Sequence, residues 1–251
     1  MSGVDAKDAV VFVTGANRGI GRSIAEEAVA RGARKVYAAA RDVAGVQDLV
    51  EQHPDTVVAV KLDVTDDAQI ADAAAAAGDV QILINNAGVA GYCGVIYDHD
   101  AETAHREMAT NYFGPVNMAR AFTPAVTANG NGAVATVISV GGLSSFPMAA
   151  TYSASKAAMH SATQAMRAEL GPQGVAVFGI YPGPIDTDMA AGVPFDKESP
   201  QNVAIRIFDD MQKGVEDITT DAFADDFVQR LKADAKTVEK EAGAMAHQPT
   251  A

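Results

Sequence analysis

Three residues in the second half of the chain have types and a spacing suited to proton transfer. Tyr152 and Lys156 are four positions apart in the run Tyr-Ser-Ala-Ser-Lys, and Ser139 lies thirteen positions upstream of the tyrosine. Residues four apart share one face of a helix, so the lysine ammonium would stand beside the phenol. An unperturbed tyrosine has a pKa of about 10, and a neighbouring positive charge lowers it by stabilising the phenolate. The pattern predicts that Tyr152 exchanges a proton with a carbonyl oxygen, which Ser139 would hold by a hydrogen bond.

A glycine-rich run near the N-terminus predicts a nucleotide site. An apolar run is followed by Gly-Ala-Asn-Arg-Gly-Ile-Gly at positions 15–21, ahead of a helical pattern. A strand, a glycine turn and a helix present backbone N–H groups and a positive dipole end to a pyrophosphate. Taken alone, the spacing also fits an ordinary strand–helix turn. The cofactor contacts predicted from this run are Gly15, Asn17, Arg18, Gly19, Ile20 and Gly21.

Further cofactor contacts are expected where the later strands end, because ligands of parallel sheets bind beyond the carboxyl ends of the strands. Asp63 and Val64 close the third predicted strand, and Asp63 suits an adenine amino group or, alternatively, a cap for the next helix. Asn86, Ala87 and Gly88 follow the fourth strand, where consecutive asparagines also form simple turns. Gly88 would let the backbone pass close to a ribose or a nicotinamide.

The end of the second predicted strand indicates which nicotinamide cofactor is bound. An acidic residue there favours NAD through the ribose 2′-hydroxyl, whereas a basic residue pairs with the 2′-phosphate of NADP. This chain has Arg41 at that point and Arg18 inside the glycine run, so two cations would converge on one phosphate. Asp42 could instead neutralise Arg41 or bind a ribose hydroxyl. The arginines predict NADP (NADPH).

The elements that must position these residues alternate between apolar β-branched runs and longer helical patterns. We expect strands at 9–14, 35–40, 57–63, 81–85, 133–139 and 175–181, with helices beginning near Ile20, Asp67, Ala101 and Ser153. This alternation is typical of a doubly wound, Rossmann-like α/β fold with a parallel sheet. No linker or repeat interrupts the chain, which indicates a single domain over residues 1–251.

The C-terminal third has a different pattern. Ser199 followed by Pro200 is an N-cap signature, and Gly214 closes the helix, which would form a cap on the substrate side near 190–214. A second helix is expected over 221–242, with Phe223 and Phe227 on its apolar stripe. After Thr219 we find no further strand, so the sheet would have six or seven strands. Residues 243–251 lack periodicity and are expected to form a flexible tail.

Composition narrows the classes of partner. The formal net charge of −13 argues against nucleic acid and against an anionic membrane surface. Cys93 is the single cysteine, so no intrachain disulfide can form, and the N-terminal residues show no secretory pattern. These features favour a cytoplasmic location. The five histidines lack paired ligand spacing, so no metal site is predicted.

In its ordered set of motifs the chain resembles the short-chain dehydrogenase/reductase family, over roughly residues 10–189. The motifs are the glycine run, Asn-Asn-Ala-Gly at 85–88, Ser139, the Tyr152–Lys156 pair, and Pro-Gly-Pro-Ile-Asp-Thr at 182–187. Arg18 and Arg41 add a resemblance to its NADPH-preferring carbonyl reductases. The resemblance implies that Asn111 holds a water that relays protons to Lys156, and that Tyr152 and Lys156 also contact the cofactor. It further implies contacts with the nicotinamide end from Pro182, Gly183, Ile185 and Thr187.

The residues expected to face the substrate are apolar and partly aromatic. They are Tyr92, Cys93, Phe146, Met148, Met189 and Phe195, with Val89, Leu143 and Phe208 as further candidates. Because this wall offers no cation for a carboxylate or phosphate, we expect an uncharged, fairly hydrophobic ketone or secondary alcohol.

Several alternatives remain open. The protein could be an NAD-dependent alcohol or hydroxysteroid dehydrogenase, or a dinucleotide-binding sensor without turnover. A reductase of 3-oxoacyl thioesters is less favoured, because the chain is acidic and a terminal strand is not found. The family commonly forms tetramers around a terminal strand. Because no such strand is found here, we expect a homodimer built by helices near 101–128 and 153–171.

Overall fold

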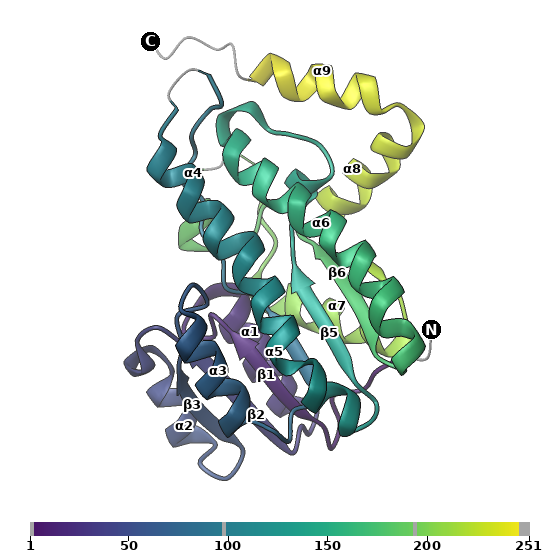
Figure 1. Ribbon diagram of the computed structural model, residues 1–251. Coiled ribbons are helices and arrows are strands. Elements are labelled where there is room, and N and C mark those ends of the chain that lie inside the picture. Colours follow the sequence, from purple (N-terminus) through teal and green to yellow (C-terminus); the bar gives the residue numbers. More distant parts are fainter. Residues whose placement is uncertain (1–2, 97–98, 193–194, 246–251) are drawn as a thin grey trace.

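Seven parallel strands form one sheet in the order β3-β2-β1-β4-β5-β6-β7 (Figure 1). The structure is a computed structural model that describes residues 3–96, 99–192 and 195–245. The chain order changes direction between β1 and β4, which is where parallel α/β sheets bind ligands. The strands are β1 (Val10–Thr14), β2 (Lys35–Ala40), β3 (Val57–Lys61), β4 (Ile82–Asn85), β5 (Ala133–Val137), β6 (Ala176–Tyr181) and β7 (Asp217–Thr219).

Helices cover both faces of the sheet, because the buried strands present apolar side chains alternately to each face. In β1, Val11 and Val13 pack against α1 (Gly19–Ala30), α2 (Gln47–Gln52) and α7 (Pro200–Lys213). Val10 and Phe12 face the opposite layer, which consists of α3 (Asp67–Ala76), α5 (Gly114–Ala128) and α6 (Ala150–Leu170). The predicted doubly wound α/β fold is therefore confirmed.

The seventh strand corrects the sequence analysis, which found no strand near the C-terminus. β7 has only three residues and pairs in parallel with β6, with Ile218 opposite Ile180. Ile218 alone is buried, so the segment shows no apolar run or alternation. Arg167 of α6 fastens its start by donating to the Glu216 carbonyl at 2.7 Å. Because β7 exists, the argument from a missing terminal strand no longer counts against a tetramer or against a 3-oxoacyl thioester reductase.

The helix expected over 221–242 is two helices. α8 (Ala222–Ala233) ends at Asp234, whose extended backbone breaks the helix, and α9 (Ala235–Met245) follows. Asp234 then accepts hydrogen bonds from the Lys236 and Thr237 N–H groups at the start of α9. Residues 243–245, expected to belong to a flexible tail, lie in α9, and the remainder of that tail lies outside the described residues.

The two C-terminal helices lie beyond the carboxyl ends of β5 and β6 (Figure 1). Phe227 of α8 and Val238 of α9 join a third apolar cluster with Met159 of α6 and Tyr181 of β6. In this cluster the expected aromatic stripe of α8 packs against Phe146, in the segment that precedes α6. The C-terminal helices therefore pack against α6 and β6 at the carboxyl end of the sheet.

The substrate-side cap predicted near 190–214 is wrong for most of that range. Val203, Ile207 and Met211 of α7 are buried in the central core together with α1, so α7 belongs to a helical layer of the sheet. The part of the range that does line the cavity comprises Ala190, Phe195 and the first two residues of α7, Pro200 and Gln201. Ala190 is the last residue of the 3-10 turn Asp188–Ala190. The prediction failed because the apolar face of α7 in the sequence indicates that the helix is buried, but does not indicate which element covers it.

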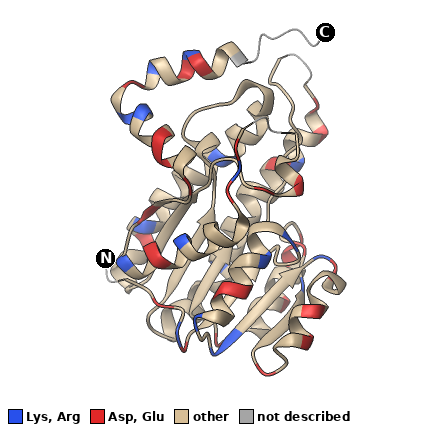
Figure 2. Cartoon of the chain, turned by 180° about the vertical axis from the view of Figure 1, so that it is seen from behind, with Lys and Arg blue, Asp and Glu red and all other residues tan. Residues whose placement is uncertain are grey.

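Charged residues lie mainly on helices and loops, and the sheet interior is nearly free of them (Figure 2). No group of three or more metal-binding side chains gathers within the described part of the chain. Among those same residues, no helix combines the length and apolar character needed to cross a bilayer.

Candidate active site

One cavity of about 1160 Å³ lies at the carboxyl ends of the strands. Its walls come from the glycine turn, the ends of β2 to β6, the start of α6 and the segment after β6. All the residues predicted to contact the cofactor line it. They are Gly15, Asn17, Arg18, Gly19, Ile20, Gly21, Arg41, Asp63, Val64, Asn86, Ala87, Gly88, Tyr152, Lys156, Pro182, Gly183, Ile185 and Thr187.

The glycine turn has the geometry of a phosphate cradle. Gly15 and Gly19 have positive φ angles of +67° and +55°, which side chains rarely adopt. A Cβ at Gly21 would lie 2.2 Å from the Gly15 carbonyl oxygen, so only glycine lets α1 approach the turn this closely. No side chain caps the N-terminus of α1 among the described residues. Its free N–H groups therefore suit an anion.

Asn86 holds the glycine turn against the end of β4. Its Nδ2 donates to the carbonyl oxygens of Thr14 and Gly15 at 2.9 and 3.2 Å. Thr14 adds a second connection between the same segments: its hydroxyl oxygen accepts from the backbone N–H groups of Asn86 and Ala87. The consecutive asparagines are therefore more than turn formers: Asn86 fixes the floor of the cavity.

Of the two roles considered for Asp42 at the end of β2, the structure speaks against the neutralisation of Arg41. Asp42 accepts a hydrogen bond from the Ala44 N–H at 3.0 Å and caps the following 3-10 turn. Arg41 is exposed and forms no ion pair within the described residues, so Asp42 does not neutralise it. Asp63 accepts from the N–H and hydroxyl of Thr65, while Asp66 caps α3.

Arg18 was expected to point, with Arg41, at a cofactor phosphate, but in the structure it pairs with a carboxylate. Its guanidinium pairs with Asp188, which stands on the turn after β6. Both side chains are largely exposed, so the pair is worth little and can exchange for a stronger anion. Arg18 and Arg41 both line the cavity, but they share no anionic partner within the described residues.

Tyr152, Ser139 and Lys156 come together on one wall of the cavity. Lys156 Nζ lies 5.7 Å from the centre of the Tyr152 ring and donates to the Val137 carbonyl at 2.8 Å. Ser139 lies two positions beyond β5, and its Oγ accepts from the Gly141 N–H at 3.1 Å. A Cβ at Gly142 would lie 2.8 Å from the Lys156 backbone carbonyl oxygen, so this turn packs directly on α6.

The pKa of the tyrosine moves in the direction opposite to the sequence prediction. Burial raises the pKa of Tyr152 to about 12, against a smaller lowering by its hydrogen bond with Ser139. Burial also lowers the pKa of Lys156 to about 8. Loss of water disfavours both charged forms, and the ammonium is directed at the Val137 carbonyl. The protein alone therefore keeps the phenol protonated, ready to donate.

Asn111 is buried behind the cavity wall rather than on it. It lies in a π-helical turn (Ala109–Phe113) that joins α4 (Ala101–Met108) to α5. Its Nδ2 donates to the Val89 carbonyl at 2.8 Å and to Ser155 Oγ at 2.9 Å, and its Oδ1 accepts from the Val89 N–H. Asn111 thus ties the loop after β4 to α6, the helix that carries Tyr152 and Lys156.

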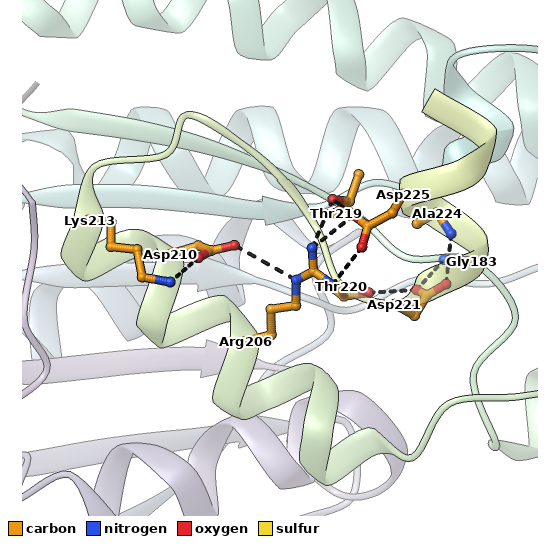
Figure 3. Close-up of polar contacts among 9 residues, drawn as sticks. All are labelled: Gly183, Arg206, Asp210, Lys213, Thr219, Thr220, Asp221, Ala224 and Asp225. Carbon is orange, nitrogen blue, oxygen red and sulfur yellow. Dashed lines mark hydrogen bonds and ion pairs between the residues drawn. The ribbon is translucent and has the colours of Figure 1, made fainter. Parts of the chain in front are cut away.

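The segment after β6 is fixed by a residue that the sequence analysis missed as a site residue. Asp221 is buried and accepts from the Gly183 N–H at 2.8 Å, while its other oxygen caps α8 at Ala224 (Figure 3). A Cβ at Gly183 would lie 2.5 Å from Asp221 Oδ1. Beside them, Arg206 of α7 pairs through two bonds with Asp225 of α8.

Asp221→Ala is expected to lower the free energy of unfolding by about 2–4 kcal/mol. The change removes a helix cap, worth about 1 kcal/mol, and leaves the Gly183 N–H unpaired at about 1–3 kcal/mol. Urea unfolding measures the difference. Asp226→Ala is the matched control, because Asp226 is an exposed residue of the same helix. Equal stability of the two variants would contradict the role given to Asp221.

The substrate side is lined by most, but not all, of the apolar residues expected there. Tyr92, Phe146, Met148, Met189, Phe195 and Val89 line the cavity. Cys93 does not: it is buried, and its Sγ lies 2.9 Å from Thr151 Oγ1. Phe208 belongs to the core under α7, and Leu143 packs in the third apolar cluster.

Phe223 of α8 also lines the cavity and was missed. Its ring centre lies 5.4 Å from that of Phe195 and 6.1 Å from that of Phe227. The aromatic periodicity of α8 showed an apolar stripe but gave no sign that its first member reaches the ligand cavity. α8 therefore contributes to the wall of the cavity.

A comparison with protein families agrees with this geometry. A family model described as short chain dehydrogenase matches residues 9–198. The chain belongs to the short-chain dehydrogenase family. The resemblance inferred from the motifs is thereby confirmed, and it places the protein in a family of oxidoreductases.

Relatives in this family differ in length and in the cofactor that their structures contain. The dehydrogenase/reductase SDR family member 7B of Xenopus tropicalis is 35% identical over 75% of this chain and 65% of its own length. A short chain dehydrogenase of Aspergillus terreus is 36% identical, and the chain spans 42% of its length. A short chain dehydrogenase from Burkholderia cenocepacia, solved with NADP, is 39% identical with a TM-score of 0.90, covering 95% of this chain and 98% of that one. A 3-ketoacyl-(acyl-carrier-protein) reductase from Brucella melitensis, solved with NADH, is 25% identical over 86% of this chain and 98% of that one, with a TM-score of 0.79.

Proposed function

We propose that the protein is an NADPH-dependent reductase of uncharged, hydrophobic ketones, reversible as a secondary-alcohol dehydrogenase. The observation that carries this proposal is the position of Tyr152, Ser139 and Lys156 on one wall of the cavity that also contains the glycine turn. Initial rates of NADPH oxidation with a panel of aryl ketones test it. A protein that binds NADPH and oxidises it with none of the ketones would overturn it.

The catalytic residues divide the work on the carbonyl group. Ser139 and the Tyr152 hydroxyl would both hydrogen-bond the carbonyl oxygen, which orients the substrate and stabilises the developing oxyanion. Tyr152 would give its proton to that oxygen as the alcohol forms. Lys156 and the buried Asn111 would hold the tyrosine region in place and return a proton through ordered water. NADPH, when bound, supplies the hydride that the carbonyl carbon accepts.

The residues present fit NADP. The uncapped start of α1 and the glycine cradle suit its pyrophosphate, and Gly88 gives the close approach that a nicotinamide ribose needs. A Cβ at Gly88 would lie 3.2 Å from Asn111 Oδ1 and 3.5 Å from Lys156 Nζ, so a side chain there would crowd both groups. Arg41, which forms no ion pair within the described residues, suits the 2′-phosphate, while Asp42 caps the following 3-10 turn. The NADP complex of the Burkholderia relative supports the same choice.

The wall facing the substrate supports an uncharged ligand. Phe146, Met148, Phe195 and Phe223 supply apolar and aromatic surface. Of the four arginines on the cavity, Arg18, Arg22 and Arg41 lie at the glycine turn, on α1 and at the end of β2, where the cofactor is expected. The fourth, Arg106 of α4, is exposed and donates to Thr103 Oγ1 at 3.2 Å. A hydrophobic ketone therefore fits this end better than a carboxylate or a phosphate ester.

The dependence of cofactor use on pH follows from the buried lysine. Lys156 has a pKa of about 8, so its ammonium is present below pH 8 and is lost as the pH rises through that value. Tyr152, with a pKa of about 12, stays protonated over the same range. We expect kcat/KM for NADPH, which reports the ligand-free enzyme, to fall above about pH 8. Oxidation of the alcohol needs the phenolate and should instead gain from higher pH.

Initial rates from neutral to alkaline pH measure this dependence, and Lys156→Arg identifies its source. A guanidinium keeps its charge throughout the range, so the variant should lose the decline near pH 8 even where its rate is lower. A decline at the same pH in Lys156→Arg would assign it to another group.

A dinucleotide-binding sensor without turnover is the second candidate. Nothing in the cavity favours it specifically, because both the phenol and the ammonium needed for turnover are in place. NADPH binding without ketone reduction, unaltered in Tyr152→Phe, would favour the sensor.

A further inference from the structure

Tyr92 adopts a backbone conformation that aromatic residues rarely take. It lies in the loop between β4 and α4, and its φ angle is +53°. Backbone strain of this kind costs free energy and persists where the surrounding contacts enforce it, often beside a functional site. The side chain lines the cavity with 47% of the residue exposed. The loop therefore presents this ring to the cavity at a cost in backbone energy.

The Tyr92 hydroxyl joins two walls of the cavity. It donates to the Met189 carbonyl oxygen at 2.6 Å, a short bond for two neutral groups. Met189 stands in the 3-10 turn Asp188–Ala190 after β6, 97 positions away in the sequence. The neighbouring Asp188 is paired with Arg18 of the glycine turn. Asp188 thus holds the turn to the glycine turn, at the cofactor end of the cavity, and Met189 holds it to Tyr92, at the substrate end.

A buried carboxyl group holds the loop that carries Tyr92. Glu107 of α4 is 0% exposed, and its Oε1 accepts from the Gly91 N–H at 2.7 Å. Its Oε2 has no hydrogen-bond partner among the described residues. A Cβ at Gly91 would lie 2.0 Å from Thr103 Cγ2, so the loop is pressed onto α4 at this point. An acid in such surroundings is costly, and the contact it makes is with the residue before Tyr92.

We propose that Tyr92 is a specificity-determining residue, whose bond to Met189 sets the width of the substrate end of the cavity. Glu107 is the positioning residue that keeps Tyr92 in place through Gly91. The enzyme then favours ketones that are compact next to the carbonyl over those with two bulky groups. This statement about selectivity rests on the proposed function, whereas the tether itself does not.

Hydrogen exchange tests the tether without any substrate. The Ala190 and Ala191 N–H groups bond within the turn, to Thr187 and Asp188, and report its opening. We expect Tyr92→Phe to speed exchange of residues 188–191 by about three- to tenfold, the range for loss of one hydrogen bond. Tyr37→Phe is the matched control, because it deletes a hydroxyl bonded to Asp79 outside the cavity. Unchanged exchange in Tyr92→Phe would overturn the proposal.

The ratio of kcat/KM for benzophenone to that for acetophenone tests selectivity. Tyr92→Phe should raise this ratio about three- to tenfold, and Tyr92→Ala should raise it further because the ring is also lost. Tyr37→Phe should leave it unchanged. If the parent reduces neither ketone, the proposed function has failed, and the exchange result alone decides on the tether. A ratio unmoved by Tyr92→Phe, in an enzyme that reduces both, would refute the selectivity.

Three variants separate positioning by Glu107 from a general structural role. Glu107→Gln keeps an acceptor for the Gly91 N–H, so exchange and selectivity should match the parent. Glu107→Leu removes the acceptor and should reproduce the effects of Tyr92→Phe. Should that variant not fold, Glu107→Met, with its more adaptable side chain, takes its place. Added to Tyr92→Phe, the Leu change should have no further effect. Additive effects, or a Gln variant that behaves like Leu, would refute the role of Glu107.

Discussion

Replacing Tyr152 with Phe is expected to lower kcat for ketone reduction by about 10²- to 10⁴-fold. Loss of a positioned general acid costs about this much, because the alkoxide that forms must then take its proton from water. The phenyl ring fills the same space, so NADPH should still bind and the protein should remain folded. Steady-state rates and a direct titration of NADPH binding together separate the chemical step from cofactor affinity.

Tyr37→Phe is the control for this variant. It also deletes a partly buried hydroxyl, but one on β2 that bonds Asp79 away from the cavity. Its kcat should equal that of the parent. A Tyr152→Phe enzyme as active as Tyr37→Phe would remove the tyrosine from the mechanism.

Local patterns were enough to predict that the motif segments line one cavity. The glycine turn, the Asn-Asn-Ala-Gly segment and the residues at 182–187 follow buried strands, and parallel strands bring their carboxyl ends to one edge of the sheet. The pairing of Tyr152 with Lys156 needed only the period of a helix. Each of these inferences needs only one of two rules: the common edge at which parallel strands end, or the shared helix face of residues four apart.

What the sequence did not show depends on contacts between distant segments. β7 is a strand because β6 offers it a partner, and its own residues show no alternation. Asp221 meets Gly183, and Tyr92 meets Met189, across 38 and 97 positions. No spacing rule predicts such pairs without an alignment or a structure.

The pKa of Tyr152 shows a second limit. A lysine one turn away suggests a lowered pKa, but the outcome depends on how much water both groups lose. In the folded chain burial dominates and raises the pKa of Tyr152 to about 12. Charge pairing follows from sequence spacing, whereas desolvation depends on everything packed around the pair.

Arg41→Asp should lower kcat/KM for NADPH by about 10- to 100-fold, while that for NADH stays level or rises. The guanidinium would bond the 2′-phosphate, and a charge-assisted hydrogen bond is worth about 1.5–3 kcal/mol. The new carboxylate would repel the phosphate and could accept from the 2′-hydroxyl of NADH. Arg34→Asp is the matched control: it makes the same change of charge at the opposite end of β2, so its preference should stay that of the parent. The ratio of the two kcat/KM values is the quantity to measure, because a general loss of stability lowers both equally. An unchanged ratio in Arg41→Asp would leave Arg18 to be tested as the phosphate ligand, once freed from Asp188.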